Sequence, residues 1–268
     1  MKKPTLQKTL ILSLLTVVVG CSQGGGGTNT IESSQGYDQV PDGTEKPVEV
    51  SGFRLDQEVS KFKNRYQLND LNTKLTDNKG VGLEELWGTR NMRVVLHGVM
   101  YRGGANNKYL QPARSNVNPL ATVGLDNLCR EDFGAAVYLY SENFVTAPRS
   151  VNCTNTAHQP QSLQYKQYAA AGEKEKILDL VFKRIKGDLN GPVYAHCWNG
   201  WHSSGLISAI ALKQFCGWTD AQADAYWVKN TDGNSDGFTT LRKRIKDFTP
   251  LAKYKITAEE KSLICPRP

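Results

Sequence analysis

Apolar and polar positions along residues 92–263 follow two different periods. Short continuous apolar runs at 92–96, 135–140 and 193–196 are typical of strands buried on both faces. Longer stretches place their apolar residues on one side of a helix, and these are residues 119–132, 164–186, 206–212, 220–229, 239–248 and 258–263. Because strands alternate with helices, we expect an α/β fold with a central mixed sheet flanked by helices.

Three stretches lack such a pattern. Residues 52–90 are mixed and polar, with one short helix expected around residues 83–87. Residues 105–118 and 141–162 read as loops, and the second is long and irregular. Long loops inside compact domains tend to be functional or disordered. We therefore expect residues 141–162 to be either a functional loop or a disordered one.

The amino terminus has the parts of an export signal. Lys2, Lys3 and Lys8 precede an apolar run over residues 10–20, which is shorter than the roughly 20 residues of a permanent membrane helix. The run ends at Val-Val-Gly-Cys21, which resembles the lipobox of bacterial lipoproteins. That resemblance implies a signal peptide over residues 1–20, an acylated Cys21 and a protein anchored at the bacterial cell envelope, on the outer membrane or cell surface. The alternative is an ordinary signal peptide with a chance cysteine.

Residues 21–47 are rich in Gly, Ser, Thr, Asn and Gln and have no apolar periodicity. Such a segment buries too little apolar surface to offset chain entropy, so we expect a flexible tether. Residues 48–268 are then long enough for one α/β domain. The lipid would be the membrane attachment of this domain.

The charge of the chain changes little of this picture. The formal net charge is +7, and it falls to 30 − 26 = +4 without residues 1–20. Basic stretches at 183–186 and 242–244 are expected to be solvated helix faces. Nothing in the sequence favours a nucleic-acid partner, a cofactor or a metal, and the oligomeric state is open.

Five cysteines remain after Cys21: Cys129, Cys153, Cys197, Cys216 and Cys265. An exported compartment is oxidising, so an odd count leaves one thiol over, and we expect this to be Cys197. The pairing of the other four is open, and some of them could be buried thiols.

The segment from Val193 to Gly205 carries the chemistry. A strand leads into Cys197, a glycine-bearing loop follows, and a helix begins directly after it. Backbone N–H groups of such a loop converge on one point, where the helix dipole adds positive potential. A cysteine at that point is favoured as the thiolate, which is the nucleophilic form.

This loop resembles the signature of the cysteine-dependent tyrosine and dual-specificity phosphatases, which is His-Cys, five residues, Arg, Ser/Thr, Gly. The matching positions are His196, Cys197, Gly200, Ser204 and Gly205. Weaker similarities, such as Met-Tyr-Arg-Gly-Gly at 100–104, extend the resemblance over roughly residues 92–230.

The resemblance implies that Cys197 attacks phosphorus and forms a phosphocysteine, and that Ser204 helps the thiolate to leave. The loop residues that would bind phosphate are Trp198, Asn199, Gly200, Trp201, Ser203 and Gly205. The departure is at Ser203, which stands where the family has arginine. Serine supplies one donor and no charge in place of a planar fork. A protonated His202 could supply part of that charge; otherwise it is an exposed loop histidine.

The general acid of the family is also missing. Its aspartate lies some thirty residues before the cysteine, whereas residues 151–169 contain no Asp or Glu. His158 could donate the proton, and Glu142 is a weaker candidate, although a structural or solvated role is the commoner one for each. Trp198 and Trp201 would make the mouth of the loop aromatic, which would suit a ring-bearing substrate.

Two functions follow from these departures. The chain is either an exported phosphatase that works through Cys197 or an inactive phosphatase-fold module that binds phosphorylated or anionic ligands.

A papain-like hydrolase fits poorly because the only later histidine is His202. A zinc site at Cys197 and its neighbours lacks the usual ligand spacing. Asp232 and Asp236 match half of a calcium loop, but Lys243 stands at its twelfth position, so a plain turn is the simpler interpretation.

Overall fold

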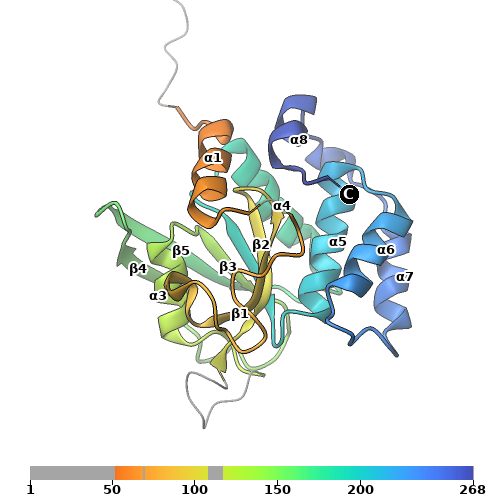
Figure 1. Ribbon diagram of the computed structural model, residues 1–268, viewed down its shortest axis with the longest axis horizontal. Coiled ribbons are helices and arrows are strands. Elements are labelled where there is room, and N and C mark those ends of the chain that lie inside the picture. Colours follow the sequence, from red (N-terminus) through yellow and green to blue (C-terminus); the bar gives the residue numbers. More distant parts are fainter. Residues whose placement is uncertain (1–51, 69, 108–116, 268) are drawn as a thin grey trace, which may run out of the picture. The chain divides into compact units, whose positions relative to one another are not determined.

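Six strands form one mixed sheet in the order β1-β2-β6-β3-β5-β4 in the computed structural model, which describes residues 52–68, 70–107 and 117–267 (Figure 1). The strands are β1 (Thr89–Leu96), β2 (Met100–Ala105), β3 (Ala135–Tyr138), β4 (Ser150–Thr154), β5 (Pro160–Gln167) and β6 (Val193–Cys197). Strands β2, β6, β3 and β5 run parallel, while β1 and β4 pair antiparallel at the two edges. The predicted α/β class with a mixed central sheet is confirmed.

Helices cover both faces of the sheet. α4 (Lys174–Lys186) and α5 (His202–Cys216) lie on one face, with α6 (Asp220–Lys229) and α7 (Thr239–Asp247) packed against α5 (Figure 1). α1 (Leu55–Tyr66) and α3 (Thr122–Arg130) lie on the other face, and α8 (Ala258–Ile264) contacts α1. Short 3-10 turns occupy Glu84–Leu86 and Ala252–Tyr254. No helix of the described ranges is long and apolar enough to cross a membrane.

Aromatic packing fixes α1 against the sheet. The rings of Phe62 and Tyr101 lie 6.2 Å apart, and the ring of Phe133 is 5.2 Å from that of Tyr101. Successive residues of a strand point to opposite faces, so Tyr101 faces α1 and the next residue, Arg102, faces α5 and α6. This alternation places a buried arginine directly beside the helix that follows the Cys197 loop.

Three predictions about local structure were wrong. Residues 150–167 were expected to be a loop followed by the start of a helix, and they form the hairpin of β4 and β5. Both strands are largely solvent-facing, so their apolar pattern is too weak to show a strand. α4 begins at Lys174, ten residues later than expected. α1 lies in the stretch that was expected to be irregular, with Val59, Phe62 and Tyr66 forming its buried stripe.

Two disulfides join Cys129 to Cys153 and Cys216 to Cys265, and Cys197 is a free, buried thiol. The prediction of one unpaired thiol at Cys197 is confirmed. The first bridge ties α3 to the exposed β4 strand, and the second ties the end of α5 to the segment after α8. The expectations for residues 1–20, Cys21 and the tether over 21–47 lie outside the described residues.

Candidate functional site at the Cys197 loop

The loop between β6 and α5 starts at Cys197, at the carboxyl end of β6 and next to β2 and β3. Cys197 Sγ lies 3.4 Å from Ser204 Oγ, in the first turn of α5, and both side chains are buried. The two predicted partners, a cysteine and the serine seven positions later, are therefore in contact. The carboxyl ends of parallel strands in an open α/β sheet are where ligands bind.

Glycines allow the loop to lie against the end of β2. Gly200 has φ +76°, and a Cβ there would come within 2.8 Å of the carbonyl carbon of Gly103. A Cβ on Gly104 would come within 2.6 Å of the backbone of Asn199. The Gly-Gly pair at the end of β2 and the glycine of the loop thus permit the same close approach, which larger residues would prevent.

Arg102 determines how the loop peptides are turned. Its side chain is fully buried, and Nη2 donates to the carbonyls of Gly200 and Trp201, at 3.1 Å for Trp201. In a trans peptide the N–H group points opposite to the carbonyl, so the N–H groups of Trp201 and His202 point away from Arg102. The first turn of α5 adds N–H groups that have no acceptor within the helix. These donors are the groups that the predicted anion cradle requires.

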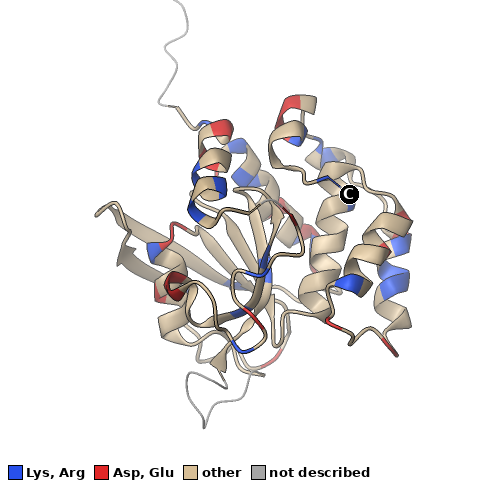
Figure 2. Ribbon diagram, in the orientation of Figure 1, with Lys and Arg blue, Asp and Glu red and all other residues tan. Residues whose placement is uncertain are grey.

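Positive charge is concentrated behind the loop. Arg93 and Arg102 are register partners in β1 and β2, and both are buried. Figure 2 shows basic residues within these strands of the sheet. Burial lowers the pKa of Arg93, and the charge of Arg102 lowers it further, to about 10. Arg102 Nε and Nη1 have no hydrogen-bond partner in the described part of the chain. Arg90 Nη1 donates to Asn199 Oδ1 at 3.1 Å and so holds the loop from the same side.

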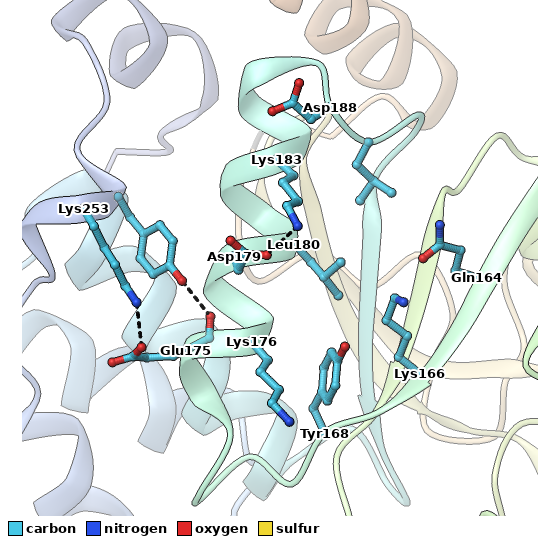
Figure 3. Close-up of a pocket in the computed structure, with 12 residues that line it drawn as sticks. Gln164, Lys166, Tyr168, Glu175, Lys176, Asp179, Leu180, Lys183, Asp188 and Lys253 are labelled. Atoms are coloured by element: carbon cyan, nitrogen blue, oxygen red, sulfur yellow. Dashed lines mark hydrogen bonds and ion pairs between the residues drawn. The ribbon is translucent and has the colours of Figure 1, made fainter.

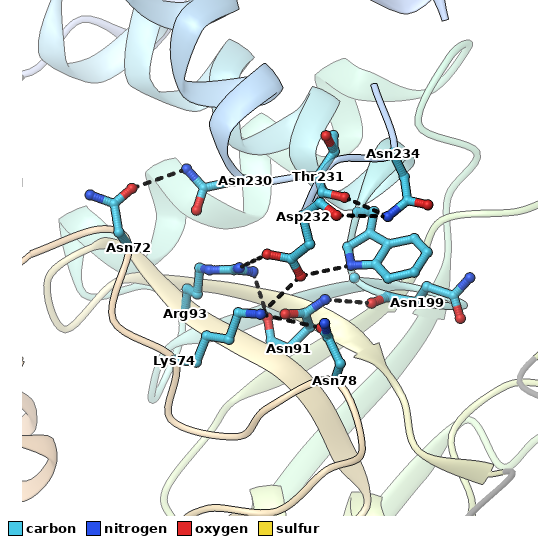
Figure 4. A network of polar contacts seen from close by, with 12 residues as sticks. Asn72, Lys74, Asn78, Asn91, Arg93, Asn199, Asn230, Thr231, Asp232 and Asn234 are labelled. Atoms are coloured by element: carbon cyan, nitrogen blue, oxygen red, sulfur yellow. Dashed lines mark hydrogen bonds and ion pairs between the residues drawn. The ribbon is translucent and has the colours of Figure 1, made fainter. Parts of the chain in front are cut away.

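Asp232 joins the loop to β1 and to the segment before it (Figure 4). Its carboxylate accepts hydrogen bonds from Arg93 Nη2 at 3.0 Å, Lys74 Nζ at 2.9 Å and Trp201 Nε1 at 3.0 Å. Burial raises the pKa of Asp232, but the hydrogen bond from Lys74 and the charge of Arg93 outweigh it and lower the value to about 2. The carboxylate is therefore ionised at every physiological pH and holds the Trp201 side chain in place.

This arrangement contradicts a calcium site at Asp232 and Asp236. Two cationic side chains occupy the carboxylate of Asp232, which leaves it without the free oxygens that calcium needs. Residues 231–233 form a turn in which Asn234 Nδ2 donates to the carbonyl of Thr231 at 3.0 Å. No group of three or more potential metal-binding side chains is present among the described residues.

His196 lies beneath the cysteine and is fully buried. Its Nδ1 is 3.3 Å from the carbonyl oxygen of Cys197, and its Nε2 is 2.9 Å from the Tyr165 hydroxyl. Burial lowers the pKa of His196 to about 3, so the ring is neutral. Because a carbonyl can only accept, Nδ1 carries the proton and Nε2 accepts from Tyr165. The ring therefore supports the backbone of Cys197 and adds no charge to the site.

Aromatic side chains flank Cys197 on the side of β3. The rings of Trp198 and Tyr140 lie 4.3 Å apart, and Trp198 Nε1 donates to the Tyr138 hydroxyl at 3.1 Å. Burial and the charge of Cys197 raise the pKa of Tyr140, although a hydrogen bond with Ser203 lowers it. Of the two tryptophans expected at the mouth, Trp198 packs in this aromatic group, whereas Trp201 is bound to Asp232.

The ring of His202 faces away from this aromatic group. Its Nε2 donates to the carbonyl of Asn234 at 2.7 Å, and the ring stacks on Phe238 with centroids 3.7 Å apart. His202 is the first residue of α5, so its backbone N–H belongs to the first turn of the helix, while its side chain contacts the loop after α6. These contacts anchor the amino end of α5.

The structure separates His158 from Cys197. His158 lies in the turn between β4 and β5, and β5 starts at the amino-terminal edge of the parallel strands. Cys197 lies at the carboxyl edge, so the sheet stands between them. The prediction that His158 is a general acid for Cys197 is therefore wrong. The turn of the β4–β5 hairpin, which contains His158, lies at the edge of the sheet opposite Cys197.

Two acidic residues lie after strands that end at the same edge as Cys197. Glu142 follows β3 and is exposed, with a hydrogen bond from Ser141 Oγ at 3.2 Å. Glu173 follows β5 and precedes α4, and its carboxylate accepts from the N–H of Ala169 at 2.9 Å and from Lys176 Nζ at 2.7 Å. The bond from Lys176 lowers the pKa of Glu173. Sequence reasoning missed Glu173 because it lies just beyond the stretch searched for a general acid.

Comparisons with known proteins add little to this geometry. No protein-family model matches the chain, and no curated protein matches it significantly. Among solved structures, the chain is similar to the crystal structure of P. aeruginosa TpbA, with a TM-score of 0.38 and 15% sequence identity. The matched region covers 58% of this chain and 86% of that one. A likeness of this degree carries no argument about function, which rests on the site itself.

Proposed function

We propose that this protein hydrolyses phosphate monoesters through the thiolate of Cys197. The observation that carries the proposal is the contact of Cys197 Sγ with Ser204 Oγ, 3.4 Å away, at the amino end of α5. The nucleophile, a hydroxyl that can stabilise it, and backbone donors for an anion meet at one point.

The reaction has two steps. The Cys197 thiolate attacks phosphorus and forms an S–P bond, while the P–O bond to the alcohol or phenol breaks and the leaving oxygen takes a proton from solvent water. Water then attacks the phosphocysteine, releases inorganic phosphate and restores the thiolate, and the Ser204 hydroxyl donates a hydrogen bond to the departing sulfur. Loop N–H groups bind the phosphoryl oxygens in both steps.

The buried arginines support an anionic ligand in place of the absent signature arginine. Arg93 is balanced by Asp232, whereas Arg102 bonds only to neutral carbonyls among the described residues. A buried positive charge of this kind is stabilised when an anion occupies the loop beside it. The positive charge of Arg102 acts on the phosphate directly through space and by orienting the loop peptides whose carbonyls it contacts.

The protein would act at the bacterial cell envelope, tethered through a lipid on Cys21. The support is the basic and apolar leader and the lipobox-like sequence before Cys21. The two disulfides fit an oxidising compartment, in which the single free thiol is the proposed nucleophile.

The alternative function is binding of phosphorylated or anionic ligands without turnover. The observation that favours it is the composition of the loop, where Ser203 provides no charge at the arginine position. The same cradle would hold the ligand in either case.

Phosphate release from p-nitrophenyl phosphate between pH 5 and 8 separates the two functions, with Cys197→Ser as the matched control. Release that disappears in the folded Cys197→Ser variant supports the phosphatase. Absence of release from protein with a free thiol, together with saturable binding of tungstate, supports the binding module. If neither release nor oxyanion binding is observed, both functions are rejected.

A further inference from the structure

A cavity of about 800 Å³ lies between α1, α6 and the carboxyl-terminal segment, apart from the Cys197 loop. His97, on its wall, belongs to the turn between β1 and β2, at the opposite edge of the sheet from Cys197. The disulfide between Cys216 and Cys265 ties the carboxyl-terminal wall to the end of α5. The cavity therefore has walls from distant parts of the chain, which tertiary packing and a covalent bridge hold together.

Three cationic side chains line this cavity: Lys63 from α1, Lys229 from α6 and Arg267 after α8. None of them forms a direct ion pair with another described residue, although the charge of Lys229, after the hydrogen bonds from Thr73 and Asn72, lowers the pKa of Asp70. Asp70 is the acidic residue of the lining, and its carboxylate accepts from the backbone of Asn72 at 2.5 Å and from Thr73 Oγ1 at 2.6 Å. The lining thus carries an excess of two positive charges.

Most of the lysines that line the groove beside α4 are paired with acids (Figure 3). Three of its lysines pair with acids: Lys176 with Glu173 at 2.7 Å, Lys183 with Asp179 at 2.9 Å and Lys253 with Glu175 at 2.8 Å. These pairs have no need of an external anion. The cavity at Lys63 differs because its cations come from three separate elements and none of them forms a direct ion pair with a described residue.

Two large aromatic side chains, Trp218 and Tyr226, form part of the lining. The rings of Trp218 and Tyr226 meet edge to face with centroids 5.9 Å apart. Burial lowers the pKa of His97 to about 4, with a smaller effect from Lys63, so this ring is neutral at neutral pH and leaves the charge of the lining unchanged.

We propose that this cavity is a second binding site, which takes a small organic anion with an apolar ring. The acid group of the ligand, a carboxylate, sulfonate or phosphate, pairs with Lys63, Lys229 and Arg267, while its ring contacts the aromatic wall. The site does not depend on the chemistry at Cys197. It combines an apolar surface with a few convergent polar groups, as small-molecule sites generally do.

Calorimetric titration with 2-naphthalenesulfonate at low salt tests the site, because this probe has no phosphoester to hydrolyse. We expect saturable binding that weakens at least about tenfold in Lys63→Glu/Lys229→Glu, since two charges beside the anion are reversed. Lys255→Glu is the matched control: it makes the same kind of change on an exposed lysine outside the cavity. This variant should bind the probe as the unaltered protein does, and neutral 2-naphthol should bind more weakly.

Several results would overturn the proposal. These are the absence of saturable binding, an affinity that the folded Lys63→Glu/Lys229→Glu variant retains, and equal affinities for the anionic and neutral rings. If the double variant does not fold, Arg267→Glu replaces it, because this side chain is exposed and follows the last helix. An unchanged affinity in Arg267→Glu together with Lys63→Gln would count against the site in the same way.

Discussion

Arg93 and Arg102 lie directly opposite each other in the antiparallel pair of β1 and β2, with both side chains buried. Like charges in such positions repel. Asp232 balances Arg93, whereas the guanidinium of Arg102 bonds to carbonyls of the Cys197 loop and of Asn230. The Cys197 loop is therefore backed by a buried arginine that has no carboxylate partner among the described residues.

Replacing Arg102 by methionine tests its role in positioning the loop. The carbonyls of Gly200 and Trp201 would lose their donor, so the N–H groups opposite them would no longer be held toward the anion. We expect kcat/KM for p-nitrophenyl phosphate to fall by about a hundredfold. Arg244→Met, on the exposed side of α7, is the control. Activity within twofold of the unaltered protein in a folded Arg102→Met variant would contradict this role.

Asp232→Asn should destabilise the protein at neutral pH by about 2–4 kcal/mol, because it leaves the buried Arg93 without its partner. The pKa of Asp232 is lowered to about 2 in the folded state. Its contribution to stability is therefore present above the unfolded value, near pH 4, and is lost as the pH falls toward 2. Urea unfolding of both proteins at pH 7 and pH 2.5 measures the difference. A gap that is as large at pH 2.5 as at pH 7 would be inconsistent with this linkage.

Ser204→Ala should slow the second chemical step more than the first. The hydroxyl lies 3.4 Å from the sulfur, where it can stabilise the thiolate that leaves the phosphocysteine. We expect a burst of p-nitrophenol equal to the enzyme concentration, followed by turnover slowed by about ten- to a hundredfold. Ser208→Ala, one turn further along α5, is the matched control because its hydroxyl bonds to the carbonyl of Ser204. A uniform loss in both steps would assign Ser204 to folding of the loop instead.

Alkylation of the unfolded, unreduced protein should modify one cysteine of residues 48–268, and reduction should expose five. The structure has two disulfides and the free thiol of Cys197. Mass spectrometry after iodoacetamide treatment gives both counts. Replacing Cys216 and Cys265 together by serine should cost about 2–4 kcal/mol, because that bridge closes a loop of 49 residues. More than one modified cysteine before reduction would contradict the pairing.

Sequence patterns were reliable where a segment is buried on both faces. The apolar runs of β1, β3 and β6 predicted strands, and all three lie inside the sheet or against its helices. They were unreliable in the exposed strand β4, where the half-buried residues Val151 and Cys153 alternate with exposed polar ones and form no continuous apolar run. The helix predicted over residues 164–186 included the end of β5. The spacing of apolar residues along the chain does not mark where a strand ends and a helix begins.

The sequence by itself determined the chemistry of the loop: a strand, Cys197, a glycine, Ser204 and a helix follow one another along the chain, so local geometry brings them together. It also indicated that Cys197 stays unpaired, since an odd count leaves one thiol over. Only the tertiary structure decided what surrounds the loop. Arg93 and Asp232 are 139 positions apart, and Arg102 reaches carbonyls 98 and 99 positions away. Contacts at such separations depend on strand order and register, which no local pattern of residues specifies. The same strand order carries His158 to the edge of the sheet opposite Cys197.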